Sequence, residues 1–442
     1  MNIRHPLPVY VVNLKSRTDR KEHTRKEFLG RQEFAVTIVE AEEHERGAMG
    51  LWNTICKIIE NINEKEYEFI ILCEDDHRFT PDYSPSLLFT CIAQAKKKDA
   101  DILLGGVSWF SGALQISENT FWVDKFSGLQ FTVIYRKFFK AILEADLGAT
   151  NVPDFKIAEM TDNKFFIHPF ISTQVEFGYS DATKGNNVAG HVDGLFRNSV
   201  ECAQSLRHIA GIYKELERPV SDSEPDAYEN VVIPTYVIHQ PGSDDRLRHI
   251  EAEFSGRNEF DVTVVGTGRH PLAAYNLFFS IKEIVGTAAG NGDDVIIICE
   301  DDHQFTPHYS RKFLMENIID AYGQNAEILA GGVGKFDQIV PVTDTLFWIN
   351  SISHLQFFVL FQPVFKKILD EPFDGITEIK DILTAVTSHK MVLFPFVSGK
   401  KSFDSPAALP SEGIGEMPLR EQFASTSVRM DRICEKRRAY HE

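Results

Sequence analysis

Short apolar runs alternate with helix-like stretches along the first half of this chain, and this alternation predicts its elements. The runs typical of buried strands lie at 9–14, 35–39, 69–73 and 101–104. The stretches with helical composition or spacing lie at 17–28, 50–61 and 85–97. Two more strands are expected at 121–123 and 129–135, before a helix that continues to Leu143. Strand and helix in turn predict an α/β fold with a mainly parallel central sheet.

The whole pattern occurs twice, at a constant shift of 226 residues. Tyr10-Val-Val matches Tyr236-Val-Ile, and Pro169-Phe-Ile-Ser matches Pro395-Phe-Val-Ser. A period of this length indicates duplicated domains rather than short solenoid repeats. We therefore expect a first domain at 1–217, an acidic linker containing Pro and Ser at 218–233, and a second domain at 234–442.

Three consecutive carboxylates, Glu74-Asp75-Asp76, follow the apolar run at 69–73, and Glu300-Asp301-Asp302 repeats them in the second copy. Carboxylates this close repel one another unless a cation lies among them, and their hard oxygens suit Mg²⁺ or Mn²⁺ shared with a phosphate. A solvated acidic loop is the alternative interpretation. Ligands bind such sheets at the carboxyl ends of strands, so the 14–20 loop, the triplet and Gly105-Gly106 are expected along one rim.

Composition argues against some classes of partner. The net charge is −18, from 46 basic and 64 acidic residues, whereas nucleic-acid-binding proteins present a basic face. The same charge disfavours docking on an anionic membrane. Six cysteines without a CxxC pair indicate a reducing compartment, and no signal peptide or membrane-spanning apolar run is visible. We expect a cytoplasmic protein with no nucleic-acid partner and no integral membrane segment, whose two copies pack on each other.

Three segments of the first copy together resemble glycosyltransferase family 25, which includes bacterial lipopolysaccharide-type sugar transferases and collagen galactosyltransferases. They are Val11-Val-Asn-Leu-Lys-Ser-Arg-Thr-Asp-Arg20, the Gly47-Ala-Met-Gly50 that opens a helix, and the apolar run into Glu-Asp-Asp. The resemblance implies tandem GT-A domains with a DxD-like metal motif. It also implies transfer of a hexose from a nucleotide-sugar donor to a glycan or other hydroxyl acceptor, in polysaccharide biosynthesis.

The resemblance assigns roles to individual residues. The expected donor-binding residues are Asn13, Arg17, Arg20, Gly47, Gly50, Asp75, Gly105 and Gly106. An amide reads a base or ribose edge, a guanidinium clamps phosphate, and glycines at a helix start let backbone N–H groups approach an anion. Asp76 and Glu74 are the expected ligands of Mn²⁺ or Mg²⁺, with Asp302 and Glu300 as their second-copy equivalents, and a UDP-sugar is the expected donor. A solvated helix start and an ordinary turn are the alternatives for the 13–20 and 47–50 segments.

A transferase that inverts the sugar also needs a base to take the proton of the acceptor hydroxyl. The candidates are Asp181 and Glu176, and in the alternative interpretation each only faces water. Trp109 is a candidate for the acceptor site. The second copy has His239, Ser243, Ala273 and Asn276 at the positions of Asn13, Arg17, Gly47 and Gly50. We therefore expect the first copy to be catalytic and the second to be degenerate.

The resulting hypothesis is a metal-dependent glycosyltransferase. One rival is a non-catalytic tandem module that binds nucleotide or metal and organises partners. The other is a metal-dependent phosphoryl hydrolase, because carboxylate clusters at strand ends also serve that chemistry.

Overall fold

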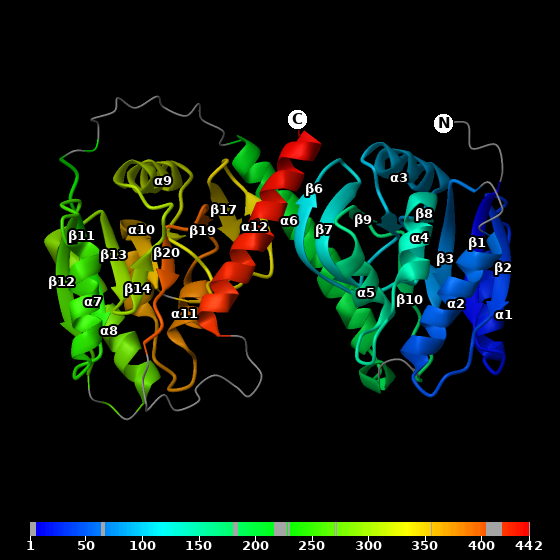
Figure 1. Cartoon of the computed structure of the whole chain (residues 1–442), viewed down its shortest axis with the longest axis horizontal. Helices are drawn as coiled ribbons and strands as arrows, with labels where there is room; N and C mark the ends of the chain where they lie inside the picture. Colours follow the sequence, from blue (N-terminus) through cyan, green and yellow to red (C-terminus); the bar gives the residue numbers. More distant parts are fainter. Residues whose placement is uncertain are drawn as a thin grey trace. The chain divides into compact units, whose positions relative to one another are not determined.

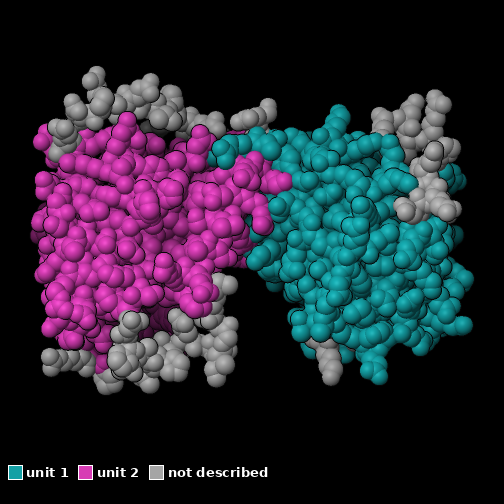
Figure 2. Space-filling model, in the orientation of Figure 1, with its two compact units in different colours: residues 1–208, 437–442 teal, residues 209–436 magenta. Residues whose placement is uncertain are grey.

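The computed structural model describes residues 6–62, 67–179, 184–215, 228, 230–268, 270, 272–354, 356–403 and 418–441. The chain forms two compact units, which Figure 2 distinguishes by colour. Unit 1 comprises residues 1–208 and 437–442, and unit 2 comprises residues 209–436. Most of the predicted linker at 218–233 lies outside the described residues, and the predicted domain boundaries stay a prediction.

Unit 1 is built on an eight-stranded sheet (Figure 1). In spatial order its strands are β2 (Phe34–Glu40), β1 (Leu7–Asn13), β3 (Phe69–Glu74), β8 (Phe131–Tyr135), β5 (Ile102–Leu104), β9 (Lys164–Ile167), β7 (Thr120–Ser127) and β6 (Trp109–Gln115). The pairs β1–β2, β1–β3 and β5–β9 are parallel, and β8 runs antiparallel between β3 and β5. The parallel strands β1, β2 and β3 therefore end at the same edge.

Helices and one small ribbon complete unit 1. The helices are α1 (Thr18–Glu27), α2 (Gly47–Ile62), α3 (Pro85–Lys97), α4 (Arg136–Glu144), α5 (Pro153–Met160), the 3₁₀ turn η1 (Lys184–Asn187) and α6 (His191–Glu215), whose residues up to 208 belong to unit 1. Local chemistry accounts for some of the helix starts: Ser84 accepts the Leu87 N–H and precedes Pro85 at the start of α3. Strand β4 (His77–Phe79) pairs antiparallel with β10 (Ser172–Gln174), directly after the acidic triplet.

Unit 2 repeats this architecture. Its sheet is ordered β12 (Phe260–Gly266), β11 (Ile233–His239), β13 (Val295–Glu300), β18 (Phe357–Phe361), β15 (Ile328–Ala330), β19 (Lys390–Leu393), β17 (Leu346–Ile349) and β16 (Ile339–Pro341). Its helices are α7 (Asp244–Phe254), α8 (Ala273–Asn291), α9 (Arg311–Gly323), α10 (Gln362–Asp370), α11 (Ile379–Val386) and α12 (Leu419–His441), whose residues up to 436 belong to unit 2. Its ribbon pairs β14 (His303–Phe305) with β20 (Ser398–Lys400).

The strand register is also repeated. Val9 lies opposite Ile71 in unit 1, and Thr235 lies opposite Ile297 in unit 2, so both partners are shifted by 226 residues. The prediction of an α/β fold made of two copies of one domain is confirmed. Among the described residues, no helix combines the length and apolarity that crossing a bilayer requires.

Candidate functional site

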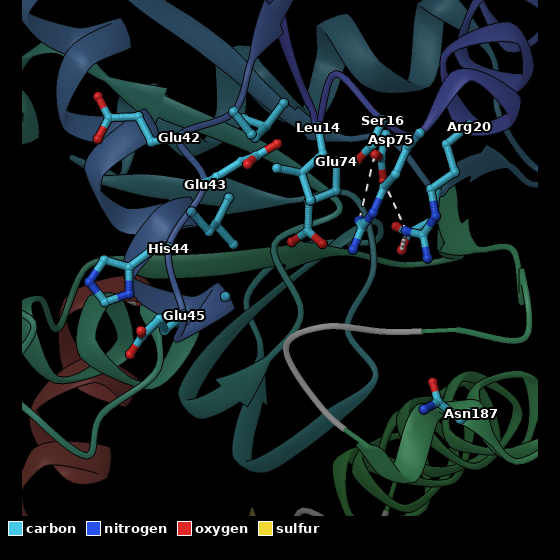
Figure 3. Close-up of a pocket in the computed structure, with 16 residues that line it drawn as sticks. Leu14, Ser16, Arg20, Glu42, Glu43, His44, Glu45, Glu74, Asp75 and Asn187 are labelled. Atoms are coloured by element: carbon cyan, nitrogen blue, oxygen red, sulfur yellow. Dashed lines mark hydrogen bonds and ion pairs between the residues drawn. The ribbon is translucent and has the colours of Figure 1, made fainter.

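A cavity of about 780 Å³ lies in unit 1 where β1, β2 and β3 end. We call it the rim cavity. Its lining residues come from the ends of three strands and the loops after them, and from α1, α2 and η1: Val12, Leu14, Ser16, Arg17, Arg20, Ala41, Glu42, Glu43, His44, Glu45, Gly47, Leu51, Glu74, Asp75, Asp76 and Asn187. Figure 3 shows Glu42–Glu45 on one side of it, Glu74 in the middle and the Asp75–Arg20 pair on the other side.

Asp75 is bound on both oxygens by protein donors. Its Oδ2 accepts the Asn13 amide at 2.9 Å and lies 3.8 Å from Nη1 of Arg17, while its Oδ1 lies 3.0 Å from Nη1 of Arg20. The side chain is 5% exposed. Because these donors already compensate its charge, Asp75 is an anchor for the site rather than an open ligand.

Asp76 is compensated only in part. Its Oδ2 lies 3.0 Å from Nη1 of Arg20, and its side chain is 17% exposed. Its Oδ1 is buried and has no hydrogen-bond partner among the described residues. Burial raises the pKa of Asp76 to about 6, although Arg20 opposes the shift. A carboxylate oxygen that lacks a partner, in an acidic cavity, has the chemistry of a ligand for a hard divalent cation.

Glu74 ends β3 and lines the cavity beside Asp76. Burial, Asp76 and Asp154 together raise its pKa well above the usual value, so a cation near it would favour its charged form. Within the described ranges, no three His, Cys, Asp or Glu side chains come together as a metal cluster. A cation at Asp76 therefore needs further ligands from a bound molecule, as Mg²⁺ does when it is shared with substrate phosphates.

The two arginines predicted to bind the donor differ in accessibility. Arg20 is 5% exposed; besides both aspartates it donates to the carbonyl of Tyr179 at 2.7 Å, and the ring of Phe177 lies 4.8 Å away. Its guanidinium is thus committed to the protein. Arg17 is 15% exposed and lines the cavity, so it is the better placed of the two to contact a phosphate.

Four other predicted donor residues are not among those that line the cavity: Asn13, Gly50, Gly105 and Gly106. A Cβ on Gly106 would lie 2.2 Å from the carbonyl oxygen of Ser172, and one on Gly105 would lie 2.8 Å from the ring of Phe131. These two glycines therefore permit the close approach of β10 to β5. Gly47 does line the cavity, at the start of α2, where free backbone N–H groups favour an anion.

Gly50 packs against the chain that follows β2. A Cβ there would lie 2.4 Å from the carbonyl oxygen of Glu42. In unit 2 both residues of this contact differ: Asn276 stands at the position of Gly50, and Gly268 stands at the position of Glu42. The Asn276 side chain then accepts the His270 N–H at 2.9 Å and donates to the His270 carbonyl at 2.8 Å.

Of the two residues predicted as the catalytic base, the structure describes Glu176. Glu176 accepts backbone N–H groups of Gly190, Val192 and Asp193 at 2.6–3.2 Å around the start of α6, and these bonds lower its pKa. It is a helix cap in this structure. Asp181 lies outside the described residues.

An exposed aromatic pair lies near the same rim. Trp109 and Phe155 are 39% and 43% exposed, and their ring centroids are 6.4 Å apart. Phe155 follows Asp154, which accepts the Ser127 hydroxyl at 2.6 Å and is close enough to Glu74 to raise its pKa. Unit 2 has Lys335, Lys380 and Asp381 at the positions of Trp109, Asp154 and Phe155.

Sequence reasoning missed the Glu42-Glu43-His44-Glu45 wall of the cavity. The segment follows the predicted strand at 35–39, and the rule that places ligands at carboxyl ends of strands applies to it as well. The second copy has Gly268, Arg269, His270 and Pro271 there, so three acidic residues of the wall have no acidic counterpart.

The second triplet has different partners. Asp301 is bound by Nδ1 of His239 at 2.8 Å and by Nη1 of Arg246 at 2.8 Å, as Asn13 and Arg20 bind Asp75. Asp302 lies 3.2 Å from both Arg246 and Lys400, and its side chain is only 3% exposed. Thus Asp302 contacts two protein cations, and it is less accessible than Asp76.

No family model matches the sequence, and no curated protein does. The fold search finds A197 from STIV at 14% identity and a TM-score of 0.30, over 39% of this chain and 87% of that one. It also finds a UDP-glucose pyrophosphorylase complexed with UDP-glucose, at 12% identity and a TM-score of 0.27, over 45% and 81%. A mannosyltransferase, PcManGT from Pyrobaculum calidifontis in complex with GDP-Man and Mn²⁺, matches at 12% identity and a TM-score of 0.22, over 43% and 64%.

Proposed function

We propose that unit 1 is a metal-dependent glycosyltransferase that moves a sugar from a nucleoside-diphosphate donor to a hydroxyl acceptor. The observation that carries this proposal is the unpartnered, buried Oδ1 of Asp76 in the wall of the rim cavity. Around it lie the guanidinium of Arg17, the start of α2 at Gly47 and an acidic lining. Those are groups suited to a diphosphate held together with a divalent cation.

Asp76 would hold the cation, with Glu74 as the second carboxylate. When bound, Mn²⁺ or Mg²⁺ neutralises the charge that develops on the departing nucleoside diphosphate. Arg20 and Asn13 would support the site indirectly, because they bind Asp75 and thereby fix the turn that carries Asp76. This arrangement keeps the ligand in place before the donor arrives.

Arg17 and the first turn of α2 would contact the diphosphate. Both line the cavity, and Ser16 adds a hydroxyl beside them. Apolar side chains for the face of a nucleobase come from Leu14 and Leu51. A UDP-sugar stays our first choice of donor.

The acceptor would lie toward Trp109. An exposed indole offers a flat apolar face to a sugar ring, and the Trp109–Phe155 pair stands near Asp154 and hence near Glu74. Asp181 is the proposed base, because Glu176 is already bound by three N–H groups.

The test is Mn²⁺-dependent turnover of UDP-, GDP- and CMP-sugars by the wild type, Asp76→Asn and Asp302→Asn. We expect one donor to be turned over, with a loss of at least a hundredfold in Asp76→Asn and none in Asp302→Asn. Donor binding without turnover would favour the non-catalytic module. Release of inorganic phosphate, or cleavage of generic phosphodiesters, would favour the hydrolase.

A further inference from the structure

Gln174 and Lys400 occupy the same position in the two units, at the ends of β10 and β20. Gln174 pairs with His77 across its ribbon, and Lys400 pairs with His303. Each therefore lies beside the turn that carries the acidic triplet of its own unit. The two-stranded ribbon around this position is the same in both units, but the side chain is neutral in unit 1 and positively charged in unit 2.

In unit 2, the ammonium of Lys400 reaches the triplet. Its Nζ lies 3.2 Å from Oδ2 of Asp302, the oxygen that Arg246 also contacts. The Lys400 side chain is 25% exposed, whereas that of Asp302 is 3% exposed, so the carboxylate that the lysine contacts is almost fully removed from solvent. Oδ1 of Asp302, like that of Asp76, is buried and has no hydrogen-bond partner in the part of the chain that the structure describes, so charge and access distinguish the two sites.

In unit 1, the neutral amide of Gln174 interacts with Asp76. Among the described residues, the cation in contact with Oδ2 of Asp76 is Arg20, at 3.0 Å. A divalent cation on a carboxylate oxygen sits at about 2.1 Å from it. An ammonium held about 3 Å from the same carboxylate would repel such an ion strongly, because little water intervenes to screen the charges. A lysine and a divalent cation are thus alternatives at this position.

We propose that Lys400 is a resident cation that replaces the divalent ion in unit 2, so that the chain takes up one such ion, in unit 1. This inference rests on the proposed metal site of unit 1. The residue at position 174 or 400 then decides whether a unit depends on metal. Other positions agree with this division, since unit 2 has Gly268 for Glu42 and Lys380 for Asp154.

The experiment is a Mn²⁺ titration of the full chain followed by electron paramagnetic resonance, with and without UDP. The wild type should bind one ion, which is lost in Asp76→Asn and kept in Asp302→Asn. Gln174→Lys should weaken Mn²⁺ binding at least tenfold. Gln174→Met is the matched control without charge, and it should keep the affinity within threefold.

The reciprocal variant is Lys400→Gln. It should gain a second Mn²⁺ site, which the double variant Lys400→Gln/Asp302→Asn loses again. It should also melt at a lower temperature than the wild type, with Mn²⁺ restoring part of the difference. Circular dichroism verifies that every variant is folded.

Two results would overturn the inference: a wild type that binds a second ion sensitive to Asp302→Asn, or unchanged Mn²⁺ affinity in Gln174→Lys. One ion bound through Asp76 without turnover of any nucleotide-sugar would instead refute the proposed function and leave the role of Lys400 intact. A wild type that binds no Mn²⁺ would refute the metal site of unit 1 and the inference together.

Discussion

Nη1 of Arg20 lies 3.0 Å from Oδ1 of Asp75, and both side chains are 5% exposed. Removing the guanidinium leaves two carboxylates, Asp75 and Asp76, in a poorly hydrated site without their main counter-charge. We expect Arg20→Ala to lower the free energy of unfolding of unit 1 by about 3–5 kcal/mol. Urea unfolding, followed for each unit by its own probe, measures the loss.

Arg246→Ala is the matched variant in unit 2. Arg246 is 33% exposed, and Lys400 and His239 also contact the aspartates there. The loss should therefore be clearly smaller than for Arg20→Ala. Equal losses in the two units would contradict this account of the charge balance.

Gly106 tests how tightly β10 packs on β5. A Cβ there would lie 2.2 Å from the Ser172 carbonyl oxygen, and one on Gly332 would lie 2.5 Å from that of Ser398. Gly106→Ala and Gly332→Ala should each destabilise their unit by about 1–3 kcal/mol. Gly194→Ala is the control, because no other side chain of the described residues comes within 4 Å of a Cβ built there, and alanine favours the helix. Urea unfolding measures the loss. An unchanged free energy of unfolding in Gly106→Ala would contradict the prediction, because it would mean that the backbone makes room for the methyl group without loss of stability.

The burial of His77 predicts that the free energy of unfolding of unit 1 depends on pH. Burial lowers its pKa to about 3, since its Nδ1 bonds Ser172 at 2.7 Å while its Nε2 has no partner among the described residues, and His23 and Arg31 add positive charge. Its pKa in the unfolded chain is about 6.5. The stability it contributes is present above pH 6.5 and is lost as the pH falls toward 3. Near pH 5 the slope should be about 1.4 kcal/mol per pH unit.

His77→Gln should remove this slope from unit 1, whatever it costs in absolute stability. Asp76 and Glu74 have raised pKa values and oppose the trend, but they are present in both proteins, so the difference isolates the histidine. Unfolding free energies at pH 5, 6 and 7 give the slope. An unchanged slope would mean that His77 is not buried neutral.

Substituting Glu176 distinguishes a helix-capping role from the role of catalytic base. As the acceptor of three N–H groups at α6, it should tolerate Glu176→Gln with kcat within about threefold, at a lower melting temperature. A general base contributes about 10²–10⁴ in rate, which is the loss we expect for Asp181→Asn. A loss of that size in Glu176→Gln would make Glu176 the base after all.

Trp109→Ala tests the acceptor side. We expect KM for the acceptor to rise about tenfold while KM for the donor stays unchanged, because Trp109 is not among the residues that line the rim cavity. Trp109→Phe should retain part of the affinity. A rise in the donor KM alone would place Trp109 with the nucleotide.

The sequence predicted the sheet well where the signal is long and periodic. The duplicated apolar runs before Glu74 and Glu300 are six-residue strands in matching register. Hydrophobic burial determines such strands locally, and the rim rule then places the triplet correctly.

Contacts between distant segments were not predictable in this way. Strand β10 has three residues, which is too short to leave a periodic pattern, yet it brings Gln174 beside Asp76. Likewise, the composition at 13–20 gives no sign that Arg20 is buried and Arg17 accessible. Only the packed fold distinguishes Arg20, which is buried against both aspartates, from Arg17, which pairs with Asp75 and also lines the cavity.

The exchanged pair at Gly50 and Glu42 bears on how the two halves diverged. Asparagine at position 50 has no room while the Glu42 carbonyl stands 2.4 Å from its Cβ, and unit 2 accommodates Asn276 opposite Gly268. A Cβ on Gly268 would lie only 3.0 Å from Oδ1 of Asn276, so the asparagine of unit 2 favours a glycine at position 268. A chimera that carries the rim of one half on the other therefore has to exchange the helix position and the loop position together.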